Sequence, residues 1–174
     1  MVTLLPAPAT VLSRAELAGV TRAFADRVLA GEFAVESDPD QRWHVRIHAD
    51  DQVDVWLISW TTDQGTELHD HGPSAGAFTV VEGTLNEAVW VTGEAADEGG
   101  LIDLPRSQGQ TVTFGTGYVH DVRNLEQPVA VSVHAYSPPL NVMHYYDVDG
   151  DRLHTRASQW TDDPEAPAPD RVAS

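Results

Sequence analysis

The sequence predicts an all-β fold: a small antiparallel β-barrel with one N-terminal α-helix packed on it. Two features support this class. A single segment near the N-terminus has helical spacing, and from residue 42 onward short runs of β-branched and aromatic residues alternate with turn formers. Antiparallel strands in this number close into a barrel or a jelly-roll-like pair of sheets. Because 174 residues can bury a sizeable core, we expect residues 1–160 to form a single domain.

The expected helix spans about residues 13–30. It begins with a capping box, in which Ser13 and Glu16 stand three positions apart, and it ends before Gly31. Apolar residues at helical spacing indicate that one face packs on the barrel. These residues are Leu17, Val20, Phe24 and Val28.

Seven strands are expected after the helix. Each is short, and glycine, proline or polar residues separate it from the next. Glu82 and Gly83 are expected to form a hairpin turn between the second and the third. The expected strands are residues 53–60, 77–81, 85–91, 111–114, 119–124, 129–136 and 141–147.

Composition and charge limit the function classes. Residues 161–174 are rich in proline, alanine and aspartate, and we expect a flexible acidic tail there, since little apolar surface offsets its ordering entropy. The net charge of -17 disfavours nucleic acid and anionic membranes as partners. We expect a cytoplasmic protein, because no signal-like or membrane-spanning apolar run is visible. The absence of cysteine excludes disulfides and thiolate ligands, and nothing identifies a protein partner.

Three histidines form the most informative pattern in the chain. His69 and His71 are two residues apart, so in a strand their side chains point to the same side. His120 lies in a later glycine-framed motif and can approach from another strand. Because three imidazole nitrogens around one point make a metal site, we predict His69, His71 and His120 as metal ligands.

The segment after the paired histidines offers no carboxylate. Residues 72–76 are Gly, Pro, Ser, Ala and Gly. Three neutral histidines leave a divalent ion its full charge and open coordination positions, whereas an added carboxylate would lower that charge. Such a centre favours an anionic substrate that binds the metal directly, above all a thiolate.

A second alternating pattern lies near residues 131–136. Ser132, His134 and Tyr136 fall on one side of this expected strand, and apolar residues fall on the other. Either side could face the interior of the barrel, because alternation alone does not choose between them.

Together these motifs resemble the bacterial cysteine dioxygenases, which are thiol dioxygenases of the cupin fold. The resemblance covers about residues 42–147 and implies a cupin β-barrel. It implies that the three histidines hold one non-haem Fe(II) per chain, that the serine, histidine and tyrosine of the second pattern form a catalytic relay beside it, and that the bond before Pro138 is cis. The motifs are Leu68-His69-Asp70-His71-Gly72, Gly117-Tyr118-Val119-His120 and Ser132-Val133-His134-Ala135-Tyr136-Ser137-Pro138-Pro139.

Two positions qualify the resemblance. Gly76 stands where mammalian members carry a cysteine that crosslinks to the active-site tyrosine, so no such crosslink can form here. Family members bind the substrate carboxylate with an arginine, best matched by Arg46, although a second register places Val45 at that position. The substrate-binding residues that the resemblance implies are Arg46, His44 and Trp60.

The resemblance implies oxidation of L-cysteine by O₂ to cysteine sulfinic acid. A dioxygenase of 3-mercaptopropionate or another small thiol, in which glutamine replaces the arginine, is the nearest rival function. Three histidines could also hold zinc in a hydrolase or isomerase, and a cupin could bind or sense a ligand without catalysis. We expect three other histidines, His48, His144 and His154, to be ordinary structural or surface residues.

Overall fold

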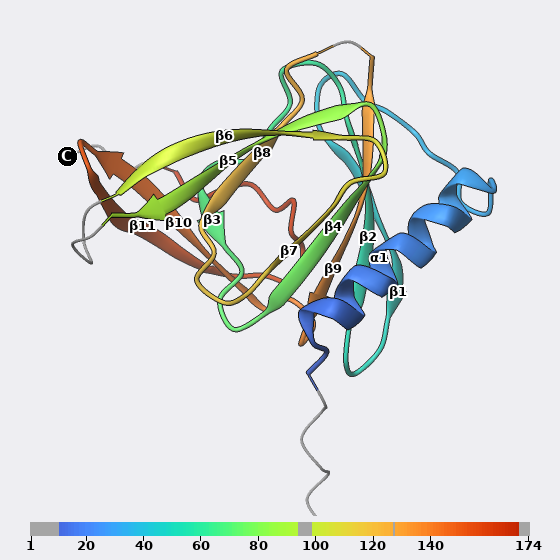
Figure 1. Cartoon of the computed structure of the whole chain (residues 1–174), viewed down its shortest axis with the longest axis horizontal. Coiled ribbons are helices and arrows are strands. Elements are labelled where there is room, and N and C mark those ends of the chain that lie inside the picture. The colour runs from blue at the N-terminus through green and yellow to red at the C-terminus, as the bar shows by residue number, and fades with distance from the viewer. Residues whose placement is uncertain (1–10, 94–98, 127, 171–174) are drawn as a thin grey trace, which may run out of the picture.

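The computed structural model describes residues 11–93, 99–126 and 128–170, which form two antiparallel sheets and one helix (Figure 1). The first sheet consists, in spatial order, of β1 (Trp43–Ala49), β2 (Asp54–Trp60), β9 (Ala130–Ser137), β4 (Ala75–Glu82) and β7 (Thr111–Phe114). The second consists of β11 (Arg152–Trp160), β10 (Val142–Asp149), β3 (His69–Asp70), β8 (His120–Arg123), β5 (Thr84–Thr92) and β6 (Gly99–Ser107). The predicted all-β class with an N-terminal helix is confirmed.

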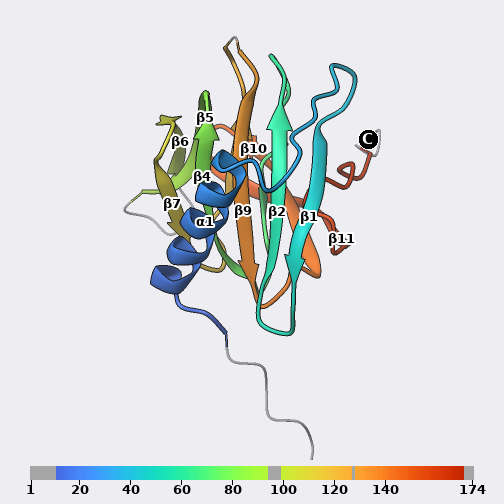
Figure 2. The ribbon, with the colours of Figure 1, turned by 90° about the vertical axis from the view of Figure 1, so that its right-hand side faces the viewer.

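Helix α1 (Arg14–Leu29) lies across the outer face of the five-stranded sheet (Figure 2). The predicted capping box is present, with Ser13 and Glu16 each accepting a hydrogen bond from the backbone of the other. Val20 and Phe24 are only partly buried, because small residues occupy the side of the helix nearest the sheet. No helix in the described ranges is long and apolar enough to cross a membrane.

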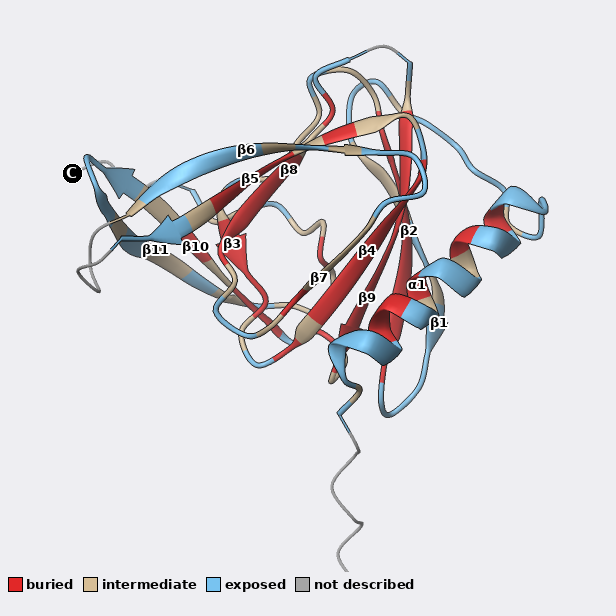
Figure 3. Ribbon diagram, viewed as in Figure 1, coloured by how far each residue is buried: buried red, intermediate tan, exposed pale blue. Residues whose placement is uncertain are grey.

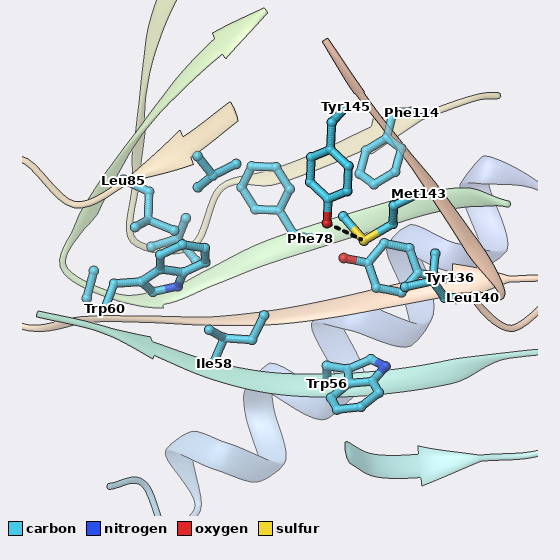
Figure 4. Packing of buried hydrophobic residues seen from close by; sticks show 13 residues of the cluster. Trp56, Ile58, Trp60, Phe78, Leu85, Phe114, Tyr136, Leu140, Met143 and Tyr145 are labelled. Carbon is cyan, nitrogen blue, oxygen red and sulfur yellow. Dashed lines mark hydrogen bonds between the residues drawn. The ribbon is translucent and has the colours of Figure 1, made fainter. Parts of the chain in front are cut away.

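The core lies on both sides of the five-stranded sheet. Strands β2, β4 and β9 are buried throughout most of their length (Figure 3). Val133 and Ala135 pack toward the helix, whereas Tyr136 and Trp60 belong to the cluster between the sheets (Figure 4). The polar side of β9 therefore faces the interior of the barrel.

Four strands lie outside the expected set: β1, β3, β6 and β11. Strands β1, β6 and β11 stand at sheet edges and are largely exposed, so they lack the apolar alternation that identifies a half-buried strand. Strand β3 has two residues, too few for a periodic signal. The predicted hairpin between β4 and β5 is confirmed, with Gly83 at a φ of 75° that favours glycine.

Residues 161–170, expected to belong to a flexible tail, lie against the barrel, and residues 171–174 fall outside the described ranges. Pro164 is buried, and Ala168 packs on the cluster between the sheets. Acidic side chains of this segment also pair with basic side chains near β1. These ion pairs and apolar contacts together position a segment whose composition alone predicts little burial.

Candidate metal centre

Neighbouring strands of the six-stranded sheet bring the three predicted ligands together. Strand β3 lies between β10 and β8, and the ladder places His69 directly opposite His120. His71 follows β3 by one residue. All three side chains are buried, so they meet inside the barrel rather than on its surface.

Asp70, between the first two histidines, fixes the local backbone. Its carboxylate accepts hydrogen bonds from the backbone N–H of Gly72 at 2.9 Å and from the Tyr146 hydroxyl at 2.7 Å, and it lies 2.8 Å from His144 Nδ1. Gly72 has a φ of 54°, and a Cβ there would lie 2.4 Å from Val142 Cγ1. The motif therefore requires both its aspartate and its glycine to place His69 and His71.

The ligand-capable ring nitrogens of His69, His71 and His120 lie within 4.8 Å of one another. The Nε2 atoms of His69 and His71 are 3.2 Å apart. The Nδ1–H of His69 donates to the Glu67 carbonyl at 2.7 Å, which leaves the Nε2 of His69 as an acceptor. His120 Nε2 is buried and has no hydrogen-bond partner among the described residues. Ring nitrogens that converge in this way, one of them without a partner, fit a bound metal ion, and the three histidines could hold one.

Burial keeps the imidazoles of His69 and His71 neutral. It lowers the pKa of His69 to about 3, and it lowers the pKa of His71 well below its usual range, while neighbouring histidines add to both effects. A neutral imidazole offers a lone pair to a metal, whereas a protonated one cannot. His69 and His71 can therefore each offer a lone pair to a cation at neutral pH.

Glu87 orients the His120 ring through a hydrogen bond to its Nδ1 atom. Its Oε1 accepts a hydrogen bond from His120 Nδ1 at 2.8 Å, and its Oε2 pairs with Arg106 Nη2 at 2.6 Å. Burial alone would raise the pKa of Glu87, but these two partners outweigh burial and hold that pKa below its usual value. A carboxylate behind a histidine fixes its tautomer and increases its basicity as a ligand. Sequence reasoning missed Glu87, although its place on the same strand face as Leu85 and Val89 marks a carboxylate among inward-facing residues.

The polar face of β9 forms one wall beside the histidines. Ser132 Oγ lies 2.9 Å from His134 Nε2 and accepts a hydrogen bond from Trp60 Nε1 at 2.9 Å. The Tyr136 ring lies 4.7 Å from the His71 ring and 6.5 Å from the His134 ring. Among the described residues, no hydrogen bond joins the Tyr136 hydroxyl to His134. The serine, histidine and tyrosine therefore share one wall, and ring packing holds Tyr136. The bond between Ser137 and Pro138 is cis.

The structure places Arg46 and His44 at the rim of the barrel rather than beside the three histidines. Arg46 Nη1 pairs with Asp162 Oδ2 at 3.2 Å, and these side chains are 40% and 72% exposed. His44 Nε2 lies 3.1 Å from Asp163 Oδ1. Trp60, in contrast, lines the cavity that His69, His71 and His120 share.

An arginine that shares a cavity with one of the three histidines is Arg42. It lines a cavity together with His69, its guanidinium lies 5.3 Å from the Trp60 ring centre, and its partner is Glu165. The side chains of Arg42 and Glu165 are only 19% and 4% exposed. Sequence reasoning missed Arg42, although it stands two residues before His44 and so shares its strand face.

The remaining histidines lie away from the three-histidine cluster. His48 Nε2 pairs with Asp50 on the surface at 3.1 Å, and His154 is exposed. His144 contacts the Asp70 carboxylate and so supports the backbone of the paired-histidine motif.

Comparisons with known proteins identify the family of this chain. The family model for cysteine dioxygenase type I matches residues 22–149. Cysteine dioxygenase type 1 of Bos taurus is 27% identical over 125 residues, covering 67% of this chain and 62% of that protein. The Homo sapiens protein of the same name is 26% identical over 132 residues, covering 66% and 65%. The chain thus spans less than two thirds of these relatives.

A solved structure supports the fold alone. Oxalate oxidase in complex with the substrate analogue glycolate superposes with a TM-score of 0.53 at 15% identity, covering 66% of this chain and 60% of that one. The family match has more weight, because it extends over most of the described barrel and includes all three metal-ligand candidates. The chain belongs to the cysteine dioxygenase type I family.

Proposed function

We propose that this protein is a thiol dioxygenase that oxidises L-cysteine with O₂ to cysteine sulfinic acid at a mononuclear iron centre. The observation that carries the proposal is the ligand set: three buried histidines converge, and no carboxylate of the described residues joins their cluster. Fe(II) held by His69, His71 and His120 would supply the oxidation chemistry, with both oxygen atoms of O₂ ending on the substrate sulfur. The three-histidine set preserves the charge of the ion and so suits a thiolate.

The chain's own residues would bind and orient the substrate. Arg42 lines a cavity together with His69, and a guanidinium can bind a carboxylate through two parallel hydrogen bonds. We therefore assign the substrate carboxylate to Arg42, because Arg46, which the sequence favours for this role, is 40% exposed and pairs with Asp162. Trp60 would support Arg42 through its ring and Ser132 through its indole N–H.

Tyr136 would supply the hydroxyl group nearest the reacting atoms. Burial raises the pKa of Tyr136 well above its usual value, so it remains a protonated phenol that can donate a hydrogen bond. His134 and Ser132 lie on the same wall and would limit its position. The apolar cluster around Tyr136 would exclude water from the site (Figure 4).

Isotope-labelled turnover tests the proposal. Protein loaded anaerobically with Fe(II) and mixed with L-cysteine under ¹⁸O₂ is expected to yield cysteine sulfinic acid with both sulfinyl oxygens labelled. His120→Gln, which removes one ligand, is the matched inactive control. Faster oxidation of 3-mercaptopropionate would reassign the substrate, and hydrolytic or isomerase activity with Zn(II) and none with Fe(II) would contradict the proposal.

A further inference from the structure

A C-terminal strap, defined as residues 161–169, lies beside β1 (Figure 2). It also contributes to the wall of the cavity that the three histidines line. Both of its ends are attached to the barrel. The Thr161 N–H donates to the Asn141 carbonyl at 3.1 Å, and the Pro169 carbonyl accepts from Arg156 Nη1 at 2.7 Å. Between these attachments, Pro164 and Glu165 form part of the wall around the histidines.

Three acidic residues of the strap meet three basic residues on one face of the β1 region. The two outer pairs, Asp162 with Arg46 and Asp163 with His44, are partly exposed. Exposed pairs contribute little, typically 0 to about 1 kcal/mol. The inner pair of Glu165 and Arg42 is the buried one, and taking one partner away from a buried pair leaves a costly unpaired charge.

With the strap in this position, the histidine cavity is too small for a thiol substrate. Its volume is about 10 Å³, which is room for one water. A neighbouring cavity of about 170 Å³ lies between Arg42 and His69 on one side and strap residues Pro164 and Ala166 on the other. A substrate that contacts both the metal and Arg42 must therefore displace Glu165.

We propose that Glu165 is a specificity-determining residue. Its carboxylate pairs with the Arg42 guanidinium while the strap is closed, and a substrate carboxylate replaces it there when the strap moves away. This inference rests on the proposed function. A thiol with a carboxylate exchanges one anion for another on Arg42, so the buried guanidinium stays paired. A thiol without a carboxylate leaves Arg42 unpaired, and leaving a buried charge unpaired is costly. The strap thereby admits carboxylate-bearing thiols and resists cysteamine.

Steady-state kinetics of Glu165→Gln test this role in the full chain. The variant keeps the shape of the side chain but removes the charge that holds the strap on Arg42. We expect the KM for L-cysteine to fall on the order of tenfold with little change in kcat, because the closed state loses its buried ion pair. Asp162→Asn is the matched control, since it neutralises an exposed pair of the same strap, and its KM should stay within about twofold of the wild type.

Hydrogen exchange of the strap gives a readout independent of turnover. In anaerobic Fe(II)-loaded protein, we expect exchange in residues 161–169 to rise when L-cysteine is added, and to be fast in Glu165→Gln without it. Arg156→Gln loosens the strap from its far end without touching Arg42 and should change both readouts in the same direction. This variant keeps the test available if Glu165→Gln does not fold.

The outcomes separate this inference from the proposed function. Oxidation of L-cysteine by the wild type, with an unchanged KM in Glu165→Gln and strap exchange unaffected by L-cysteine, would overturn the role of Glu165. Failure of the wild type to oxidise any thiol with Fe(II) would overturn the proposed function instead. In that case, hydrogen exchange of the strap that rises with L-cysteine would still support competition between Glu165 and L-cysteine for Arg42. Exchange that stays constant would overturn this competition.

Discussion

Gly76 of β4 lies directly opposite Tyr136 of β9, and the Phe114 ring occupies the space that a side chain on Gly76 would take. A Cβ at Gly76 would lie 2.4 Å from two carbons of that ring. Phe114 in turn stacks on His71, with ring centres 5.1 Å apart. The position at which mammalian members of the family carry a crosslinking cysteine is therefore filled here by an aromatic ring that supports a metal-ligand candidate.

Gly76→Ala should destabilise the protein by about 1 to 3 kcal/mol, because the added methyl group forces Phe114 out of a packed position. Chemical denaturation measures this change. Gly100→Ala is the matched control, since a Cβ at Gly100 meets nothing within 4 Å. Equal stability of the two variants would contradict the packing argument.

Tyr136→Phe should lower kcat roughly ten- to a thousandfold and leave metal loading unchanged, because it removes one positioned donor and no ligand. The ring contacts with His71 remain, so the fold should be unaffected. Intact mass should also show one unmodified species before and after turnover, since the chain has no cysteine to crosslink. An unchanged kcat would assign Tyr136 a packing role only.

Glu87→Gln should weaken metal binding by about ten- to a hundredfold, the usual effect of losing the carboxylate behind a ligating histidine. The variant keeps a hydrogen-bond acceptor for His120 but loses the charge that is 2.8 Å from its Nδ1. Competition with a chromophoric chelator measures the affinity. Glu82→Gln, at an exposed position on β4, should bind metal as the wild type does, and equal affinities in both variants would contradict the role of Glu87.

His134→Gln should make stability less dependent on pH. Burial, with Coulombic repulsion from neighbouring basic groups, lowers the pKa of His134 to about 3, whereas the unfolded value is 6.5. Between these values the unfolded chain binds a proton that the folded protein does not, so stability falls as the pH falls below 6.5. At pH 5.5 the wild type should lose about 1.4 kcal/mol through this residue.

Urea denaturation of metal-free protein at pH 7.5 and 5.5 measures that loss. The other buried histidines are present in both proteins, so the difference between wild type and His134→Gln isolates one residue. The same pH dependence in both proteins would show that His134 is already protonated in the folded state or does not titrate in this window.

Local sequence patterns predict the parts of this molecule that depend on near neighbours in the chain. The spacing of His69 and His71 predicts two side chains on one side, and the capping box at Ser13 predicts where the helix begins. The register that places His69 opposite His120 joins segments far apart in sequence. The resemblance predicts that these histidines share a metal, but neither it nor periodicity predicts the register.

The parts that the sequence does not predict depend on contacts between distant segments. Glu165 lies in a stretch whose composition is typical of a tail, and its burial arises from Arg42, which is 123 positions earlier. Alternation along β1, extended one residue back to Arg42, gives Arg42, His44 and Arg46 the same face but cannot show which of them lies deepest. Depth is set by where the strap lies beside the strand, and no local pattern contains that information.

Arg42→Lys and Arg46→Lys should separate the two candidates for binding the substrate carboxylate. Lysine keeps the positive charge that Glu165 or Asp162 requires, so both variants should fold, but it loses the planar fork that binds a carboxylate through two hydrogen bonds. We expect Arg42→Lys to lower kcat/KM for L-cysteine roughly ten- to a hundredfold, because charge-assisted bidentate bonds in a buried site are the stronger kind. Arg46→Lys should change kcat/KM by less than about threefold, since the ion pair of Arg46 is exposed.

Cysteamine is the control substrate. It lacks the carboxylate, so its weaker turnover should respond much less to Arg42→Lys. A larger loss in Arg46→Lys than in Arg42→Lys would return the carboxylate to Arg46 and place the substrate at the rim of the barrel.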